Sequence, residues 1–176
     1  IGSLFSGIGG FELGLGRAIP CHPLWFCDTE PFCRSVLARR YFGTPSFQDV
    51  STLTPEQTRA VNPSRLYALV GGVPCQDISV SGSGLGLDGA RSGLWSEMAR
   101  LTRELQPHQV FLENSPALVT RGLDVILRDL HAAGYNAEWQ ILNSQMVGGL
   151  HHRRRIYLRA FQFGSFRLNF TRPWEA

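Results

Sequence analysis

The stretch Val70-Gly71-Gly72-Val73-Pro74-Cys75-Gln76-Asp77-Ile78-Ser79 decides how this chain folds. The apolar residues 66–70 predict a short buried strand that ends at the Gly-Gly pair, and Pro74 fixes the backbone just before Cys75. Open α/β sheets bind their ligands at the carboxyl ends of their strands, which is where this cysteine falls. A single cysteine in such a turn also fits a buried structural thiol, because free cysteine is among the most buried residue types. The rest of the sequence has to distinguish these two interpretations.

The composition is that of an ordinary globular protein. With 176 residues, 43% of them hydrophobic and 18% charged, the chain fits one domain with a sizeable core. No apolar run approaches the roughly 20 residues of a membrane span and no signal peptide is recognisable, so we expect a soluble, intracellular protein without a membrane partner. The four cysteines form no CxxC pair and have no histidine at ligand spacing, so we expect neither a disulfide framework nor a metal. The net charge of +3 permits a polyanionic partner without establishing one.

A glycine-rich turn, Ser6-Gly7-Ile8-Gly9-Gly10, follows a predicted strand at residues 1–5. The apolar residues at positions 11, 13, 15 and 18 then fit a helix with one face turned inward. Without Cβ atoms, the backbone N–H groups at the helix start can approach the polar groups of a ligand. The same pattern also occurs in tight strand-to-helix connections that bind nothing, so the turn alone leaves both possibilities open.

Two carboxylates end the next predicted strands. Asp28 follows the strand at residues 24–27, at about the distance of 20 residues from the glycines at which nucleotide-binding units place an acid for ribose hydroxyls. Asp28 also fits the N-cap of the helix that begins near Pro31. Asp49 ends a third candidate strand at residues 47–50, where it fits either a contact with an adenine amino group or a cap for residues 51–54 and the helix start at Pro55.

The second half of the chain adds a loop and three further strands. Glycine and serine dominate residues 79–95, which predicts a functional lid beside Cys75, and a helix follows to residue 105. The buried strand at residues 109–112 ends in Glu113, a candidate acid or hydrogen-bond donor whose alternative role is a surface residue or helix cap. A helix over residues 123–133 precedes strands at residues 136–142 and 156–161. Arg153 and Arg155 enter the last strand, where they fit either a solvated edge or a pair that brackets an anion.

The order of these pieces resembles the catalytic half of the DNA (cytosine-5) methyltransferases over about residues 3–161. The pieces that carry the resemblance are Phe5-x-Gly7-x-Gly9-Gly10, Asp28, Asp49-Val50, Gly72-x-Pro74-Cys75-Gln76, Ser79-x-Ser81-Gly82, Glu113-Asn114 and Arg153-x-Arg155. The resemblance implies a doubly wound, Rossmann-like α/β fold with about six mostly parallel strands. It also implies S-adenosylmethionine as the cofactor, S-adenosylhomocysteine as its product and double-stranded DNA as the partner.

The resemblance assigns a role to each matching residue. Cys75 corresponds to the nucleophile that adds to carbon 6 of a flipped cytosine, Glu113 to the contact of N3 and the exocyclic amine, Arg155 to the contact of O2, and Arg153 to its companion. The implied cofactor-binding residues are Phe5, Ser6, Gly7, Ile8, Gly9, Gly10, Asp28, Thr29, Asp49, Val50, Pro74 and Leu94. The implied DNA contacts are Gln76, Ser79, Ser81, Arg91 and Asn114.

The sequence departs from the family pattern at three positions. His151 stands where the arginine motif has glutamine, Ser115 where valine usually follows Glu-Asn, and Asp28 where the ribose acid is usually glutamate. The first departure affects the first contact of the arginine motif, and the third shortens the acid by one methylene group. Arg153 and Arg155 themselves match the motif, so we expect both arginines to keep their role.

The family's variable target-recognition domain has no counterpart in this sequence. We expect residues 1–163 to form the catalytic, cofactor-binding domain and residues 164–176 to be a tail or the start of a missing recognition region. Three explanations stay open: a truncated or partly ordered chain, a split enzyme with a separate recognition subunit, and a minimal methyltransferase. The first residue, Ile1, favours a piece of a longer protein. The expected source is bacterial or phage-like, with a restriction-modification role in the cytoplasm; the alternatives are a tRNA cytosine-5 methyltransferase and a non-catalytic or split subunit.

Overall fold

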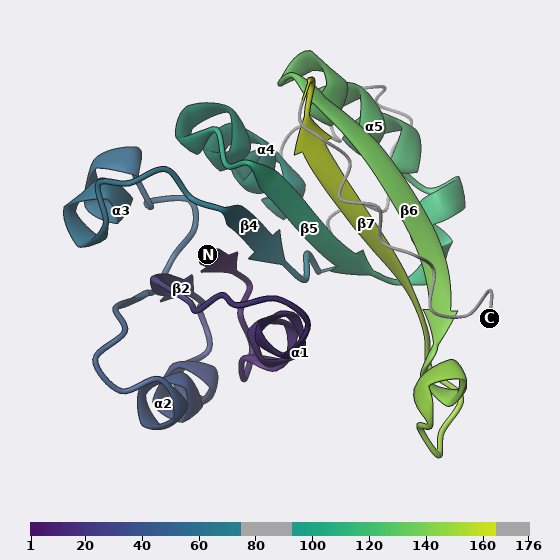
Figure 1. Cartoon of the computed structure of the whole chain (residues 1–176), viewed down its shortest axis with the longest axis horizontal. Helices are drawn as coiled ribbons and strands as arrows, with labels where there is room; N and C mark the ends of the chain where they lie inside the picture. The colour runs from purple at the N-terminus through teal and green to yellow at the C-terminus, as the bar shows by residue number, and fades with distance from the viewer. Residues whose placement is uncertain (75–92, 165–176) are drawn as a thin grey trace.

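Seven strands form one sheet in the described part of the chain, residues 1–74 and 93–164 of a computed structural model (Figure 1). The strands are β1 (Gly2–Leu4), β2 (Trp25–Cys27), β3 (Ser46–Phe47), β4 (Ala68–Gly71), β5 (Gln109–Asn114), β6 (Tyr135–Asn143) and β7 (Arg154–Gln162). The helices are α1 (Gly10–Ala18), α2 (Pro31–Arg40), α3 (Pro55–Val61), α4 (Leu94–Leu105) and α5 (Leu123–Ala132), with 3₁₀ turns at Pro116–Thr120 and Ser144–Val147.

The strand order is β3-β2-β1-β4-β5-β7-β6. The first five strands are mutually parallel, and β7 lies antiparallel between β5 and β6. The predicted doubly wound, mostly parallel fold is therefore confirmed, although the sheet has seven strands instead of about six. The third strand was predicted at residues 47–50 and is wrong there: it covers only Ser46–Phe47, because Asp49 turns the chain by accepting a hydrogen bond from the Ser51 N–H.

Helices cover both faces of the sheet. On one face, Leu69 of β4 belongs to the main core with residues of α4 and α5, including Met98 and Ile126. On the other face, Ala68 and Val70 pack against α1. Successive side chains of a strand point to opposite faces, so a strand buried on both sides reads as a continuous apolar run. This explains why residues 66–70 could be recognised as a strand.

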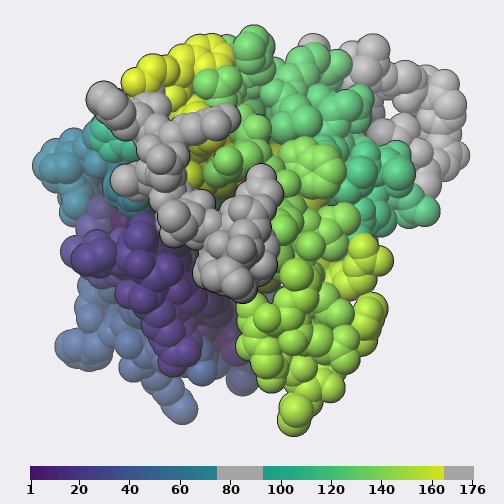
Figure 2. Space-filling model, turned by 45° about the vertical axis from the view of Figure 1, so that its right-hand side comes forward, coloured from purple at the N-terminus to yellow at the C-terminus, as the bar shows by residue number. Residues whose placement is uncertain are grey.

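The β6–β7 hairpin is the longest element of the sheet and reaches beyond the other strands (Figure 1). In Figure 2 the N-terminal elements, coloured purple and blue, lie on one side of the visible face, and the green hairpin lies on the other. Apolar side chains near the tip, Met146, Val147 and Leu150, are exposed. Among the described residues, no helix combines the length and apolar character needed to cross a bilayer.

Gly2 is required by the packing of Trp25. A Cβ atom at Gly2 would lie 2.2 Å from Cζ2 of Trp25, whose side chain is 0% exposed. We expect Gly2→Ala to lower the free energy of unfolding by about 1–3 kcal/mol, because the buried ring would have to shift to admit the methyl group. Urea denaturation measures this change.

Gly14→Ala is the matched control, because a Cβ atom at this α1 position meets nothing within 4 Å. We expect it to leave stability unchanged or to raise it by up to about 1 kcal/mol, since alanine favours helix over glycine. Equal stability of the two variants would contradict the packing account of Gly2.

Candidate active site

The carboxyl edge of the sheet brings distant parts of the sequence together. The strands β2, β1, β4 and β5 are neighbours and run in the same direction, so the segments that follow them meet at this edge. Because β7 runs antiparallel beside β5, its first residues lie at the same edge. The glycine turn, Asp28, Gly72, Glu113 and Arg155 therefore share one edge, as the order of motifs predicted.

The glycine turn has an unusual backbone. Gly7 and Gly9 have positive φ values of 54° and 82°, which glycine adopts without a steric penalty. Phe5 also has a positive φ, 51°, which is costly for an aromatic residue and typical of functional sites. Added Cβ atoms at Gly7 and Gly10 would meet no described residue within 4 Å, so the described part of the chain leaves space beside the turn. The turn thus leaves its backbone open to a ligand.

The end of α2 packs against one side of this turn. A Cβ atom at Gly9 would lie 3.0 Å from Cε2 of Tyr41 and 3.1 Å from Cδ2 of Leu37. The Arg40 guanidinium donates to the carbonyl oxygen of Ile8 at 2.9 Å. The first N–H groups of α1 have no partner inside the helix and carry the positive end of its dipole. The side of the turn away from α2 can therefore receive a polar ligand.

Asp28 connects the end of β2 to the glycine turn. Its Oδ2 accepts a hydrogen bond from the Gly7 N–H at 2.7 Å, and its Oδ1 accepts one from the Glu30 N–H at 2.9 Å. The alternative role of Asp28 as the N-cap of α2 is wrong, because Glu30 occupies that position and Asp28 lies two residues earlier. Thr29, beside it, is exposed.

Asp49 lies exposed after β3, at the same edge. Its Oδ1 accepts hydrogen bonds from the N–H and the hydroxyl of Ser51, both at 2.8 Å, and these bonds lower the pKa of its carboxyl. Its alternative role as a cap is confirmed for the segment that begins at Ser51. It is wrong for the helix start, because Thr54 caps α3 in a reciprocal pair with Gln57. The neighbouring Val50 is buried.

Glu113 and Arg155 form an ion pair beside the end of β4. The Oε1 atom of Glu113 lies 2.8 Å from Nε of Arg155, and the two side chains are 25% and 28% exposed. A Cβ atom at Gly72 would come within 3.3 Å of the other Glu113 oxygen, so glycine leaves room for this carboxylate. The buried Asn114 donates to the carbonyl oxygen of Val73 at 2.9 Å and holds the segment that precedes Cys75. Glu113 is thus partly buried and paired, and its alternative role as a helix cap is wrong, because Ser115 caps the 3₁₀ turn that follows.

Two residues near this edge were missed by the sequence analysis. Tyr157 lies two residues after Arg155 on β7, and its ring meets that of Phe11 edge-on, with the ring centroids 6.3 Å apart. Burial raises the pKa of Tyr157, and the negative charge of Glu113 raises it further. Glu12 in the first turn of α1 is buried. Positions 11, 12 and 15 lie on one side of a helix, so a helical spacing that included position 12 would have predicted that Glu12 faces inward.

Several predicted residues lie outside the described part of the chain. These are Cys75, Gln76, Ser79, Ser81 and Arg91, together with the predicted lid up to residue 92. Pro74, the last residue before this gap, is exposed, and Leu94 begins α4 and packs partly against the main core. Arg153 is exposed and precedes β7, with its N–H donating to Oδ1 of Asn143 at 3.1 Å.

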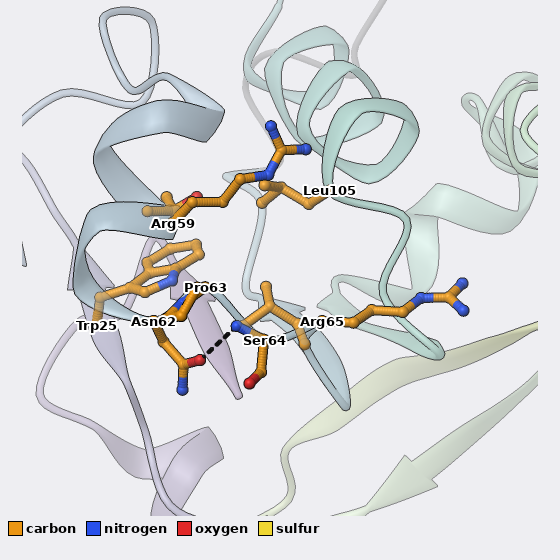
Figure 3. A pocket seen from close by; sticks show the side chains of 9 residues that line it. Trp25, Arg59, Asn62, Pro63, Ser64, Arg65 and Leu105 are labelled. Atoms are coloured by element: carbon orange, nitrogen blue, oxygen red, sulfur yellow. Dashed lines mark hydrogen bonds between the residues drawn. The ribbon is translucent and has the colours of Figure 1, made fainter.

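A separate hollow of about 190 Å³ lies at the opposite, amino edge of the sheet (Figure 3). Its walls are Trp25, Thr58, Arg59, Asn62, Pro63, Ser64, Arg65, Leu66 and Leu105. The Arg59 side chain extends toward Leu105, whereas that of Arg65 points away from the other lining residues (Figure 3). Both arginines donate to carbonyl oxygens at the end of α4, those of Glu104 and Gln106. None of the predicted site residues lines this hollow, so the carboxyl edge is the candidate site. No group of three or more potential metal ligands occurs among the described residues.

The sheet order, the glycine turn and the Glu113–Arg155 pair define a Rossmann-like α/β protein of the methyltransferase class. Solved structures share this fold. The S. pombe Dnmt2 methyltransferase matches with a TM-score of 0.74 and 20% identity over 94% of this chain and 51% of that chain. The Entamoeba histolytica methyltransferase EhMeth matches with a TM-score of 0.73 and 19% identity over 94% of this chain and 53% of that chain.

The chain belongs to the C-5 cytosine-specific DNA methylase family, whose model matches residues 1–171. It is 31% identical over 160 residues to the type II methyltransferase M.CviJI of Paramecium bursaria Chlorella virus IL3A, covering 90% of this chain and 42% of that protein. It is 31% identical over 162 residues to the type II methyltransferase M.NgoBI of Neisseria gonorrhoeae, covering 90% of this chain and 49% of that protein. The family resemblance is thus confirmed, and the chain spans less than half the length of these relatives.

Proposed function

We propose that this protein transfers a methyl group from S-adenosylmethionine to carbon 5 of cytosine in double-stranded DNA. The observation that carries the proposal is the Glu113–Arg155 pair, which lies beside Gly72 and the segment that leads to Cys75. The family to which the chain belongs and the type II methyltransferases among its relatives support DNA as the substrate. A restriction-modification role in a bacterial or viral setting follows from the same relatives.

The glycine turn fits the proposed cofactor. The open space beside Gly7 and Gly10 admits a ligand close to the backbone, and the first N–H groups of α1 suit its carboxylate. Each carboxylate oxygen of Asp28 accepts one backbone N–H and keeps a further lone pair, which can accept a ribose hydroxyl. Asp49 keeps the same capacity for an adenine amino group. S-adenosylmethionine supplies an electrophilic methyl group on its sulfonium.

Cys75 is the proposed nucleophile. Carbon 5 of cytosine is a weak nucleophile, and addition of a thiolate to carbon 6 gives an enamine whose carbon 5 can form the new C–C bond to the methyl group. Loss of the proton from carbon 5 then restores the ring double bond and breaks the Cys75–carbon 6 bond. The target carbons are enclosed in a duplex, so the base has to be flipped out of the stack.

Glu113 and Arg155 stabilise the charge that this addition creates. Electron density moves onto N3 and O2 of the ring as the sulfur–carbon bond forms, and fixed donors aimed at developing charge give the largest single contribution in many enzymes. Protonated Glu113 at N3 and Arg155 at O2 would act in this way, and their 2.8 Å contact holds the two groups side by side. Arg153 is the proposed companion of Arg155.

The remaining cofactor and DNA contacts are proposed from the family pattern. Residues 1–163 are the catalytic and cofactor-binding part, with Phe5, Val50, Pro74 and Leu94 around the cofactor. The proposed DNA contacts are Gln76, Ser79, Ser81, Arg91 and Asn114. Asn114 is buried and donates to the Val73 carbonyl oxygen, so its proposed contribution is to hold the backbone of Val73, two residues before Cys75.

A methyl-transfer assay tests the proposed function. The protein is incubated with S-adenosylmethionine labelled in its methyl group and, side by side, with duplex DNA and with tRNA, and the nucleosides are then separated. We expect label in 5-methylcytosine of the DNA. Label in the tRNA alone would assign the protein to an RNA substrate. Absence of transfer that is restored by another subunit would assign it to a split enzyme.

A further inference from the structure

The Glu12 carboxyl lies buried between α1 and the first strand. Glu12 is only 3% exposed, and its Oε2 atom has no hydrogen-bond partner among the described residues. The other oxygen, Oε1, is in short contact with the hydroxyl of Ser3. Burying an ionised carboxylate without a cation is far more costly than burying a neutral carboxyl group. This position is therefore unfavourable for a charge.

A chain of hydroxyl groups leads from Glu12 to the glycine turn. The Ser3 hydroxyl lies 2.7 Å from that of Ser6, the first residue of the turn. The Ser6 oxygen lies 3.2 Å from the carbonyl oxygen of Ser3 and 3.3 Å from that of Cys27, and it accepts the Cys27 N–H at 3.3 Å. These contacts connect α1, β1, β2 and the turn. Glu12 is thus linked to Ser6 through one serine hydroxyl.

The number of hydrogens determines the direction of this chain. Ser3 has one hydroxyl hydrogen but contacts both Glu12 and Ser6. If Ser6 donates to a backbone carbonyl, Ser3 donates to Ser6, and the hydrogen between Glu12 and Ser3 has to come from the carboxyl. A protonated Glu12 therefore supplies the hydrogen for the Glu12–Ser3 contact, while Ser3 donates to Ser6 and Ser6 to one of its two carbonyl oxygens.

Among residues 1–74 and 93–164, no cation forms an ion pair with Glu12. From α2, Arg40 donates to the Ile8 carbonyl and Arg34 to the carbonyls of Asp28 and Thr29, and neither forms an ion pair with Glu12. Tyr41 beyond the end of α2 is the titratable group that interacts with it. From β2, burial raises the pKa of Cys27 to about 12. Burial likewise raises the pKa of Glu12, and hydrogen bonds from Ser3 and its own backbone oppose this less strongly.

We infer that Glu12 is a neutral carboxyl group that donates to Ser3 and through Ser6 positions the glycine turn for the cofactor. Glu12 is a positioning residue, since it acts on the turn through two serines and touches no ligand. The role in cofactor binding rests on the proposed function; the neutral state of Glu12 does not.

The pH dependence has a defined sign. A carboxyl whose pKa is higher in the folded than in the unfolded state stabilises the fold below its unfolded pKa, and this contribution is lost as the pH rises through the folded pKa. Cofactor affinity and stability of the native protein should therefore fall as the pH rises through the pKa that Glu12 has in the folded protein. Glu12→Gln cannot ionise, so its profile should lack this component.

Isothermal titration of S-adenosylhomocysteine into the protein and its variants tests the inference between about pH 6 and about pH 9. Glu12→Gln should bind within about 3-fold of the native protein at neutral pH, because its amide can donate to Ser3. Glu12→Leu keeps the volume but loses the donor, and it should bind about 10-fold more weakly with a normal circular dichroism spectrum. Glu56→Gln, which removes an exposed acid from the first turn of α3, should change nothing.

A carboxyl ¹³C resonance of Glu12 gives a readout that needs no ligand. An ionised Glu12 at neutral pH would overturn the inference, even if the protein bound no cofactor. Unchanged affinity of Glu12→Leu, with native binding intact, would overturn the positioning role. Failure of the native protein to bind S-adenosylhomocysteine, with a neutral Glu12 resonance, would instead contradict the proposed function.

Discussion

Replacing Cys75 with serine is expected to lower the rate of methyl transfer by about 10⁴-fold or more, because a hydroxyl at neutral pH is a much weaker nucleophile than a thiolate. S-adenosylhomocysteine should still bind, since the glycine turn and Asp28 lie on other segments. Single-turnover transfer of labelled methyl groups to duplex DNA measures the loss.

The covalent step can be checked directly for Cys75. Duplex DNA that contains 5-fluorocytosine should form a complex with the native protein that survives denaturing electrophoresis, because carbon 5 then has no proton to lose. Cys75→Ser should form none. Cys21→Ala is the matched control, because Cys21 lies before β2 at the amino edge of the sheet. A trapped adduct with Cys75→Ser, or its absence in Cys21→Ala, would refute Cys75 as the nucleophile.

The second large effect is expected for Glu113→Gln. This change keeps the shape of the side chain but replaces the carboxyl that pairs with Arg155, and that would be protonated at N3 in the proposed reaction, by an amide that cannot ionise. Loss of one group that stabilises developing charge lowers kcat by about 10²–10³-fold. The affinity for S-adenosylhomocysteine should stay within about 2-fold, as measured by titration calorimetry alongside the steady-state rates.

The chain provides a matched control for Glu113. Glu138 of β6 pairs with Arg159 at 3.2 Å, on the same face of the sheet but further from the carboxyl edge. Glu138→Gln should therefore leave kcat unchanged. Since partly exposed ion pairs contribute only about 0–1 kcal/mol to stability, neither variant should unfold. Equal kcat for both variants would remove Glu113 from the reaction.

The sequence predicted the parallel part of the fold because its signals are local. A strand buried on both faces gives an apolar run, and glycine, proline or a carboxylate marks its end, as at residues 66–74. The carboxyl-edge rule then predicted that the glycine turn and Glu113 would lie at one edge. The insertion of β7 between β5 and β6 is a non-local pairing, and no residue pattern within β7 specifies it.

The same limit applies inside the site. The ion pair of Glu113 and Arg155 depends on the register in which Glu113 lies opposite Tyr157, which the order of motifs does not determine. Glu12 was missed because an acid in the first helical turn is ordinarily a solvated partner of the dipole. Only the packing of α1 against β1 shows that it faces inward.

The antiparallel seventh strand has a consequence for how the protein is made. The glycine turn, Asp28 and Gly72 all lie within the first 72 residues, whereas Arg155 reaches the edge only after the β6–β7 hairpin has closed and docked on β5. Contacts between residues far apart in sequence form late, because the chain entropy of closing the loop opposes them. On the ribosome the glycine turn and Asp28 are therefore synthesised well before the arginine that meets Glu113, so the Glu113–Arg155 pair is among the last features of this edge to form.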